Sequence, residues 1–215
     1  MSVDIWAMPL GEFRDRAASR EPTPGGGSVS AVAGALGLGL VIMALEITLA
    51  RKLDDERKAR INARVAEARA LLARLSEQAP EDIAVFERYM AAVALPKATP
   101  EETTRRTRAM ADAAAVATET PLRTARTAVE ALGIARESVA LVHRWVVSDV
   151  GAGAALLSGA VRAVLFNVDV NLDNIATAGA RDGYRRERED LERRATALGQ
   201  EIEAAVRAVL APASS

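Results

Sequence analysis

The 215-residue sequence contains no cysteine and a single histidine, His143. The absence of cysteine excludes disulfide bonds, thiolate zinc sites and a cysteine nucleophile. One histidine cannot build a multi-histidine metal site, and we expect no bound metal. Lysine and arginine total 28 against 29 acidic residues, a formal net charge of −1. No excess of one charge therefore attracts nucleic acid or an anionic membrane, and neither is an expected partner.

Aromatic residues are also scarce, at 3% of the chain, although half of all residues are apolar. The apolar content is mostly alanine and leucine, whose unbranched side chains lose little rotamer freedom in a helix. Long stretches of alternating polar and apolar residues are missing, which argues against strands. The length favours a single domain over residues 1–215. The sequence opens without the basic segment of a secretory signal, so we expect a cytoplasmic protein.

The most distinctive stretch, Pro22–Ser28, reads Pro-Thr-Pro-Gly-Gly-Gly-Ser and precedes an apolar, uncharged run over 29–45. Glycine permits positive φ and close approach of another backbone or a ligand. We expect a glycine loop that opens onto a buried helix, whose free N–H groups could bind a carboxylate, phosphate or carbonyl oxygen. A purely structural turn is an equal alternative. Residues 26–45 could span a bilayer by length, but their glycines and flanking charges favour a core helix.

A second small-residue segment, Val150–Ala160, follows Ser148 and Asp149 and continues to Asn174. Either Ser148 or Asp149 is expected to cap it. Amphipathic patterns predict further helices over 54–79, 80–94, 100–120, 121–142 and 182–210. Pro80 is expected to break one helix and start the next, and Pro121 to kink or end its helix. The sequence therefore predicts an all-α bundle of long helices around two Gly/Ala-rich core helices. Such a thin bundle, with a heptad-like last helix, leaves apolar faces that predict a homodimer.

Several segments along residues 10–175 carry a more specific signal when they are taken together and in order. They are Pro22–Ser28, Asp82–Phe86, Leu95–Lys97, Thr120–Leu122, Ser148–Gly151 and Asn167–Leu172. This series resembles the cyclodeaminase/cyclohydrolase family of folate enzymes. That family includes the deaminase half of formiminotransferase-cyclodeaminase and free-standing methenyltetrahydrofolate cyclohydrolases. The resemblance implies a helical, usually dimeric fold with a folate site lined by these segments.

The resemblance also implies the chemistry, which acts on a one-carbon unit bridging N5 and N10 of tetrahydrofolate. The enzyme would hydrolyse 5,10-methenyltetrahydrofolate to the 10-formyl form, or cyclise 5-formiminotetrahydrofolate with release of ammonia. No cofactor is implied beyond the tetrahydrofolate substrate. Two departures from the family pattern are expected beside the pocket: Glu46, near a usual asparagine, and His143–Trp145, in place of a glycine–asparagine pair. They leave open a non-catalytic folate-binding or assembly protein of the same fold.

A carboxylate would both stabilise the cationic methenyl bridge and take a proton from the attacking water. Asp149 is the first candidate and Asp82 the second, although either could serve only to stabilise a helix end. Lys97 could bind an oxygen or the glutamate tail of a folate. Asn167 and Asn171 suit the pterin edge, or else hydrogen bonds between helices. The remaining predicted substrate-binding residues are Gly25, Gly26, Gly27, Ser28 and Ser148.

Overall fold

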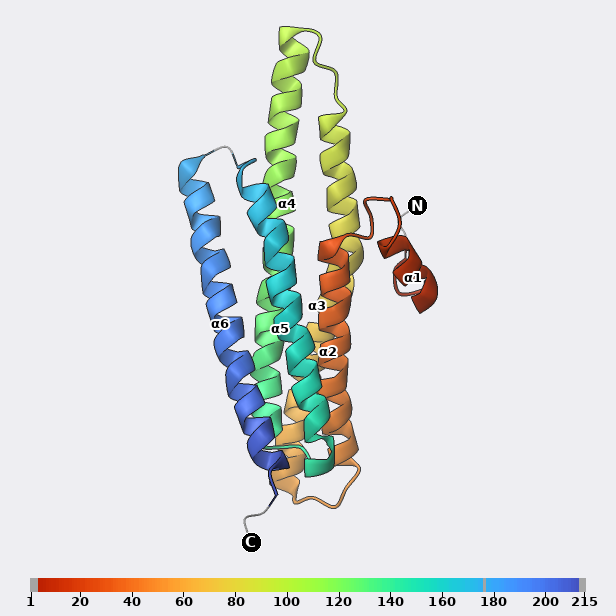
Figure 1. Cartoon of the computed structure of the whole chain (residues 1–215), viewed down its shortest axis with the longest axis vertical. Helices are drawn as coiled ribbons and strands as arrows, with labels where there is room; N and C mark the ends of the chain where they lie inside the picture. Colours follow the sequence, from red (N-terminus) through yellow and green to blue (C-terminus); the bar gives the residue numbers. More distant parts are fainter. Residues whose placement is uncertain (1–3, 176, 213–215) are drawn as a thin grey trace.

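The computed structural model describes residues 4–175 and 177–212, and over these residues the protein is helical without a strand. Five long helices form an elongated bundle (Figure 1): α2 (Gly26–Leu49), α3 (Asp55–Val93), α4 (Pro100–Val139), α5 (Val147–Leu172) and α6 (Ala178–Leu210). A short α1 (Leu10–Ala17) lies beside α3, and the 3₁₀ turn η1 (Arg144–Val146) leads into α5. The predicted all-α bundle is confirmed.

Helices α2 and α5 run antiparallel through the middle of the bundle and approach each other through glycine (Figure 1). A Cβ atom on Gly153 would lie 2.4 Å from the Gly37 carbonyl oxygen, and one on Gly37 would lie 2.7 Å from the Gly153 oxygen. Any side chain at either position would force the helices apart. Around this contact the fully buried leucines of both helices, including Leu38 and Leu157, form the core. The prediction of two small-residue core helices is confirmed.

Helices α3 and α4 each continue through a proline, so the expected break at Pro80 is wrong, and so is the alternative that Pro121 ends its helix. A proline lacks the N–H that would bond the carbonyl four residues earlier. For Pro80 that carbonyl belongs to Ser76, and it accepts a hydrogen bond of 2.8 Å from the Trp6 indole Nε1–H. For Pro121 it belongs to Ala117, and it accepts one of 2.7 Å from Asn171 Nδ2. In both helices a side chain from elsewhere replaces the missing donor.

The observed helix ends agree only in part with the ends predicted from the sequence. Helix α4 begins at Pro100, as predicted, and Thr99 and Glu102 form a capping box there. Helix α5 begins at Val147, with Val146 at its N-cap and no side-chain cap, so the expected cap at Ser148 or Asp149 is wrong. Helix α6 begins at Ala178, one turn before the predicted start at residue 182, because the Thr177 hydroxyl caps it.

Two segments, Gly26–Leu49 and Arg144–Leu172, are long and apolar enough to cross a membrane by length and composition alone. The most apolar stretch of the first is 67% buried within the bundle, as in a core helix of a folded protein. The corresponding stretch of the second is only 44% buried. Helix α5 also leaves two large apolar side chains mostly exposed, Phe166 at 65% and Val170 at 73%.

Candidate functional site

The start of α2 is where residues from three separate parts of the sequence meet. Asp82 lies in the middle of α3, and its Oδ2 accepts hydrogen bonds of 2.9 Å from both the backbone N–H and the hydroxyl of Ser28. The N-cap residue of α2, Gly25, provides no side-chain cap. The carboxylate of Asp82 therefore caps α2 from the neighbouring helix. The alternative considered from the sequence, that Asp82 only stabilises the end of its own helix, is wrong because Asp82 lies inside α3.

The glycines of the loop allow this contact by their lack of a side chain. A Cβ on Gly27 would lie 2.0 Å from Asp82 Oδ1, far inside any permitted distance. A Cβ on Gly26 would lie 3.4 Å from Oδ1 of Asn167, which comes from α5. No described glycine has a positive φ, so the loop does not use the left-handed conformations that glycine permits. The glycines matter here because they let the side chains of neighbouring helices approach the α2 backbone closely.

The Asp82 carboxyl is poised for proton transfer. Its burial raises its pKa above the ordinary aspartate value, and the two hydrogen bonds from Ser28 offset that rise only in part. Oδ2 is held by Ser28, whereas Oδ1 accepts no hydrogen bond within the described part of the chain. Oδ1 is thus available to a water molecule or a ligand. A carboxyl with a raised pKa is a stronger base, and a more effective acid at neutral pH, than an ordinary aspartate.

Hydrogen-bond donors accompany this acceptor. The backbone N–H groups of Gly26 and Gly27 open α2, and neither is bonded within the described residues. The amide of Asn167, half-buried beside Gly26, also forms no hydrogen bond there. One end of a helix thus offers two N–H donors, an amide and a basic carboxylate. This set can bind a planar heterocycle by its edge while Asp82 moves a proton.

The other predicted residues do not join this group. Asn171 lies one turn beyond Asn167, but its Nδ2 is engaged by Ala117, the interhelical alternative considered from the sequence. Lys97 is exposed in the loop between α3 and α4. Helix α3 extends about 16 Å past Asp82, at 1.5 Å per residue, and Lys97 lies beyond its end. Ser148 and Asp149 lie at the opposite end of α5 from Asn167, about 27 Å away along the helix.

The two departures from the family pattern also lie away from Asp82. Glu46 is 20 residues from Gly26 on α2, about 30 Å along the helix, and bonds Arg69 at 2.8 Å. His143–Trp145 lies at the same distal end, just before α5. The expectation that both departures flank the pocket therefore fails for the site around Asp82.

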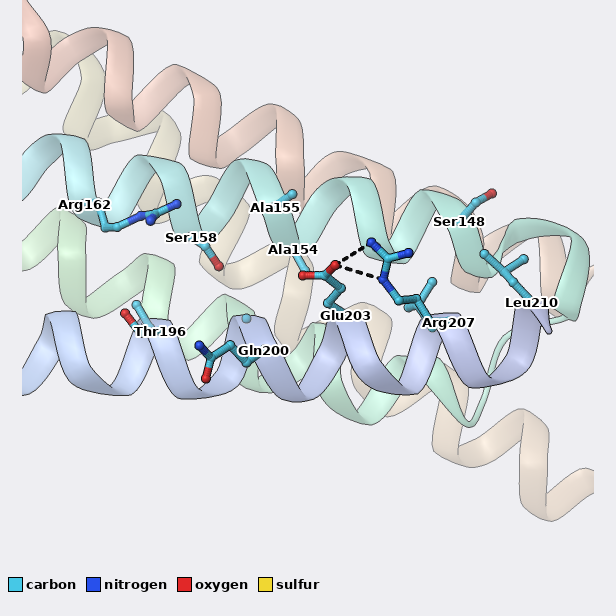
Figure 2. A pocket seen from close by; sticks show the side chains of 14 residues that line it. Ser148, Ala154, Ala155, Ser158, Arg162, Thr196, Gln200, Glu203, Arg207 and Leu210 are labelled. Atoms are coloured by element: carbon cyan, nitrogen blue, oxygen red, sulfur yellow. Dashed lines mark hydrogen bonds and ion pairs between the residues drawn. The ribbon is translucent and has the colours of Figure 1, made fainter.

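A groove between α5 and α6, of about 520 Å³, was not predicted from the sequence (Figure 2). It extends from Ser148 at one end to Arg162 at the other, past the Glu203–Arg207 ion pair. Its walls are mostly small residues, and the buried Ser158 Oγ points toward α6 without a hydrogen-bond partner. The sequence signal was present as alanine and glycine at helical spacing, but that pattern equally indicates tight packing. Of the predicted residues, only Ser148 lines this groove.

The fold and site define an all-helical protein with a buried aspartate at a glycine-rich helix start. The sequence profile of the family described as formiminotransferase-cyclodeaminase matches residues 9–190, and the chain belongs to this family. It is 30% identical over 190 residues to the methenyltetrahydrofolate cyclohydrolase of Methylorubrum extorquens, covering 88% of this chain and 91% of that one.

Two further likenesses agree. The formimidoyltransferase-cyclodeaminase of Sus scrofa is 33% identical over 168 residues, which cover 78% of this chain but 31% of that protein. The crystal structure of formiminotetrahydrofolate cyclodeaminase from Thermotoga maritima superposes with a TM-score of 0.83 at 23% identity, covering 95% and 98% of the two chains. That structural likeness supports the fold. The family resemblance read from the sequence motifs is thereby confirmed.

Proposed function

We propose that this protein is a folate one-carbon enzyme that hydrolyses 5,10-methenyltetrahydrofolate to 10-formyltetrahydrofolate. The observation that carries the proposal is the meeting of Asp82 with Gly26–Ser28 and Asn167 at the start of α2. Hydrolysis is placed first because the relative named as a cyclohydrolase is 30% identical over most of both chains, whereas the near full-length match to a cyclodeaminase is a structural one at 23% identity. The cyclodeaminase reaction on 5-formiminotetrahydrofolate is the second candidate, supported by the relatives named for it.

In the proposed reaction the methenyl carbon, part of an amidinium cation, is attacked by water. Asp82 Oδ1 accepts a proton from that water, and the negative carboxylate stabilises the neighbouring cation. The protonated Asp82 then returns its proton to N5 as the bond between that nitrogen and the carbon breaks. The formyl group stays on N10, and one proton leaves to solvent. The Gly26 and Gly27 N–H groups and the Asn167 amide would hold the pterin edge.

The predicted substrate residues fall into two groups in this proposal. Gly25, through the backbone, and Gly26, Gly27, Ser28 and Asn167 surround the reacting carbon. Ser148 and Asp149, about 27 Å along α5 from Asn167, lie outside this group, and Asn171 is bonded to Ala117. Lys97, in the loop beyond α3, stays a candidate for the glutamate tail of the folate. No cofactor is proposed beyond the folate substrate.

We further propose a homodimer that buries the exposed apolar face of α2 and α5. Leu36, Phe166 and Val170 are each more than half exposed on these two nearly uncharged helices. Val29, Met43 and Ile47 of α2 and Leu156 of α5 add to this exposed apolar surface, and an exposed apolar face of this kind marks an interface. Sedimentation should give twice the chain mass, and a monomer at micromolar concentration would contradict the proposal. A cytoplasmic location, without a membrane or nucleic-acid partner, stays a prediction.

The direct test is turnover by the purified protein. The absorbance of 5,10-methenyltetrahydrofolate should decay faster than the uncatalysed rate, in proportion to enzyme. Ammonia release from 5-formiminotetrahydrofolate, measured in parallel, distinguishes the second candidate. Folate binding in calorimetry without either reaction would support the non-catalytic alternative instead. If the protein consumes neither substrate and binds no folate, the family function is rejected for this chain.

A further inference from the structure

The end of the bundle opposite Asp82 carries a cluster that the proposed reaction does not use. It consists of Arg51, His143, Arg144 and Trp145, and we call it the basic–aromatic cluster. The Trp145 side chain is 74% exposed, an unusual position for so large an apolar ring. The His143 ring lies edge-to-face against it, with centroids 5.0 Å apart and planes at 74°. The Arg51 guanidinium lies over the indole, 5.2 Å from the ring centre.

The cluster carries positive charge that no acid of the described chain neutralises by an ion pair. Arg51 and Arg144 form no salt bridge among the described residues, whereas 17 other pairs are formed in the chain. Arg57 of α3 lies beside them and donates two hydrogen bonds to the Leu141 carbonyl. Partial burial, together with Arg51, Arg57 and Arg144, lowers the pKa of His143, and no carboxylate of residues 4–175 or 177–212 opposes that shift. The local potential therefore favours an anion.

The cluster is fixed to rigid helix ends. The His143 backbone N–H donates to the Thr48 hydroxyl at 2.9 Å, which ties the turn to the end of α2. His143 Nδ1 accepts a hydrogen bond of 3.3 Å from the Trp145 backbone N–H. The neutral imidazole therefore carries its proton on Nε2, which is a donor in both protonation states. Stacking surface, two guanidinium groups and an imidazole N–H are thus held together.

We propose that the basic–aromatic cluster binds a planar anion, an aromatic or heteroaromatic ring that carries carboxylate or phosphate groups. The ring stacks on Trp145, and the anionic group binds Arg51, Arg144 and the Nε2–H of His143. Gly27, which lies against Asp82, and Arg51, just past the end of α2, are 24 residues apart. At the helical rise this is about 36 Å, so the cluster is separate from the Asp82 site within one protomer.

Two sources supply this chemistry. One is the p-aminobenzoyl-glutamate part of a folate, a choice that rests on the proposed function. The other is a nucleoside phosphate. Both present a flat ring with acidic groups at a short distance, and the experiment below separates them.

The experiment uses the full-length protein, whose single histidine and two tryptophans allow direct readouts. The probes are p-aminobenzoyl-glutamate and AMP, with inorganic phosphate as an anion that lacks a ring, all at constant ionic strength. Binding should raise the pKa of His143 in NMR titrations, because an anion stabilises the imidazolium. In a Trp6→Phe background, the same probe should quench Trp145 emission. Saturable binding of p-aminobenzoyl-glutamate would identify the folate part as the ligand, and saturable binding of AMP would identify a nucleotide.

Variants make the test specific. Trp145→Leu and the Arg51→Gln/Arg144→Gln pair should each weaken binding at least tenfold. Arg60→Gln, which removes another exposed arginine outside the described salt bridges, should leave binding unchanged. The proposal is overturned if neither ring-bearing probe exceeds phosphate, or if Trp145→Leu binds as the wild type does. It is also overturned if Trp145 emission responds only to protein dilution, which would indicate self-association.

This outcome is independent of turnover. A protein that hydrolyses methenyltetrahydrofolate but binds neither probe fails the present proposal alone. A protein that binds a probe through Trp145 without turnover fails the proposed function alone.

Discussion

Asn171 provides the sharpest test of a structural assignment, because its amide replaces a hydrogen bond that Pro121 removes from α4. Asn171→Ala would leave the Ala117 carbonyl without either a helical or a side-chain donor. An unsatisfied buried carbonyl costs about 1–3 kcal/mol, and this one is only partly buried, so we expect about 1–2 kcal/mol. For a chain of this size that is a fall of roughly 2–8 °C in Tm. Urea unfolding followed by circular dichroism measures it.

A double-mutant cycle tests the reason for that cost. Pro121→Ala restores an N–H that can bond the Ala117 carbonyl within the helix. In this background Asn171→Ala should cost close to nothing, which gives a coupling energy of about 1–2 kcal/mol between the two positions. Asn174→Ala, at an exposed asparagine just beyond the same helix, is the matched control and should be neutral. An equal cost of Asn171→Ala in both backgrounds would refute the assignment.

Three further predictions concern close contacts and the buried carboxyl. Gly27→Ala places a methyl group 2.0 Å from Asp82 Oδ1 and should cost more than about 2 kcal/mol, whereas Gly39→Ala, with open space around its Cβ, should be neutral or stabilising in thermal melts. Gly153→Ala should separate α2 from α5 at a cost of about 2–3 kcal/mol in urea unfolding, and a neutral result would contradict the described packing. Asp82→Asn keeps an oxygen acceptor for Ser28 and removes the titration. Burial raises the native pKa above the unfolded value of about 3.9, so the wild type loses stability as pH rises from about 4 through the native pKa. Relative to the wild type, the variant should therefore gain stability from pH 4 to pH 7, and a constant difference would show that the pKa is not raised.

Local signals in the sequence accounted for most of the fold. The capping box of Thr99 and Glu102 placed the start of α4, since its hydrogen bonds join residues three apart. The small residues of α2 and α5 indicated core helices because only such residues allow close packing. The predictions made from the two prolines failed because the donors that allow α3 and α4 to continue come from Trp6 and Asn171. These donors lie 70 and 54 residues away in sequence from the carbonyls they bond. Pairings over such distances leave no local pattern.

The candidate site was predicted residue by residue but not as an arrangement. The family motifs contain Asp82, Gly27 and Asn167, and the fold brings these three residues to one helix start. The ranking of Asp149 above Asp82 rested on its place before a glycine-rich segment. Burial and hydrogen bonding decide a pKa, and both depend on which helix packs against the carboxyl. Asp82 has Ser28 and the start of α2 against it, and Asp149 lies half-buried at the far end of α5.

The central claim is that Asp82 is the base of a folate cyclohydrolase. Its most direct test compares the hydrolysis rates of Asp82→Asn and Asp149→Asn on 5,10-methenyltetrahydrofolate, with each variant shown to be folded by circular dichroism. We predict that Asp82→Asn loses at least 100-fold in kcat/KM, in keeping with the loss of a general base, on the order of 10²–10⁴. Asp149→Asn should stay within about threefold of the wild type. Activity retained in Asp82→Asn and lost in Asp149→Asn would contradict the account and place the chemistry at the opposite end of the bundle.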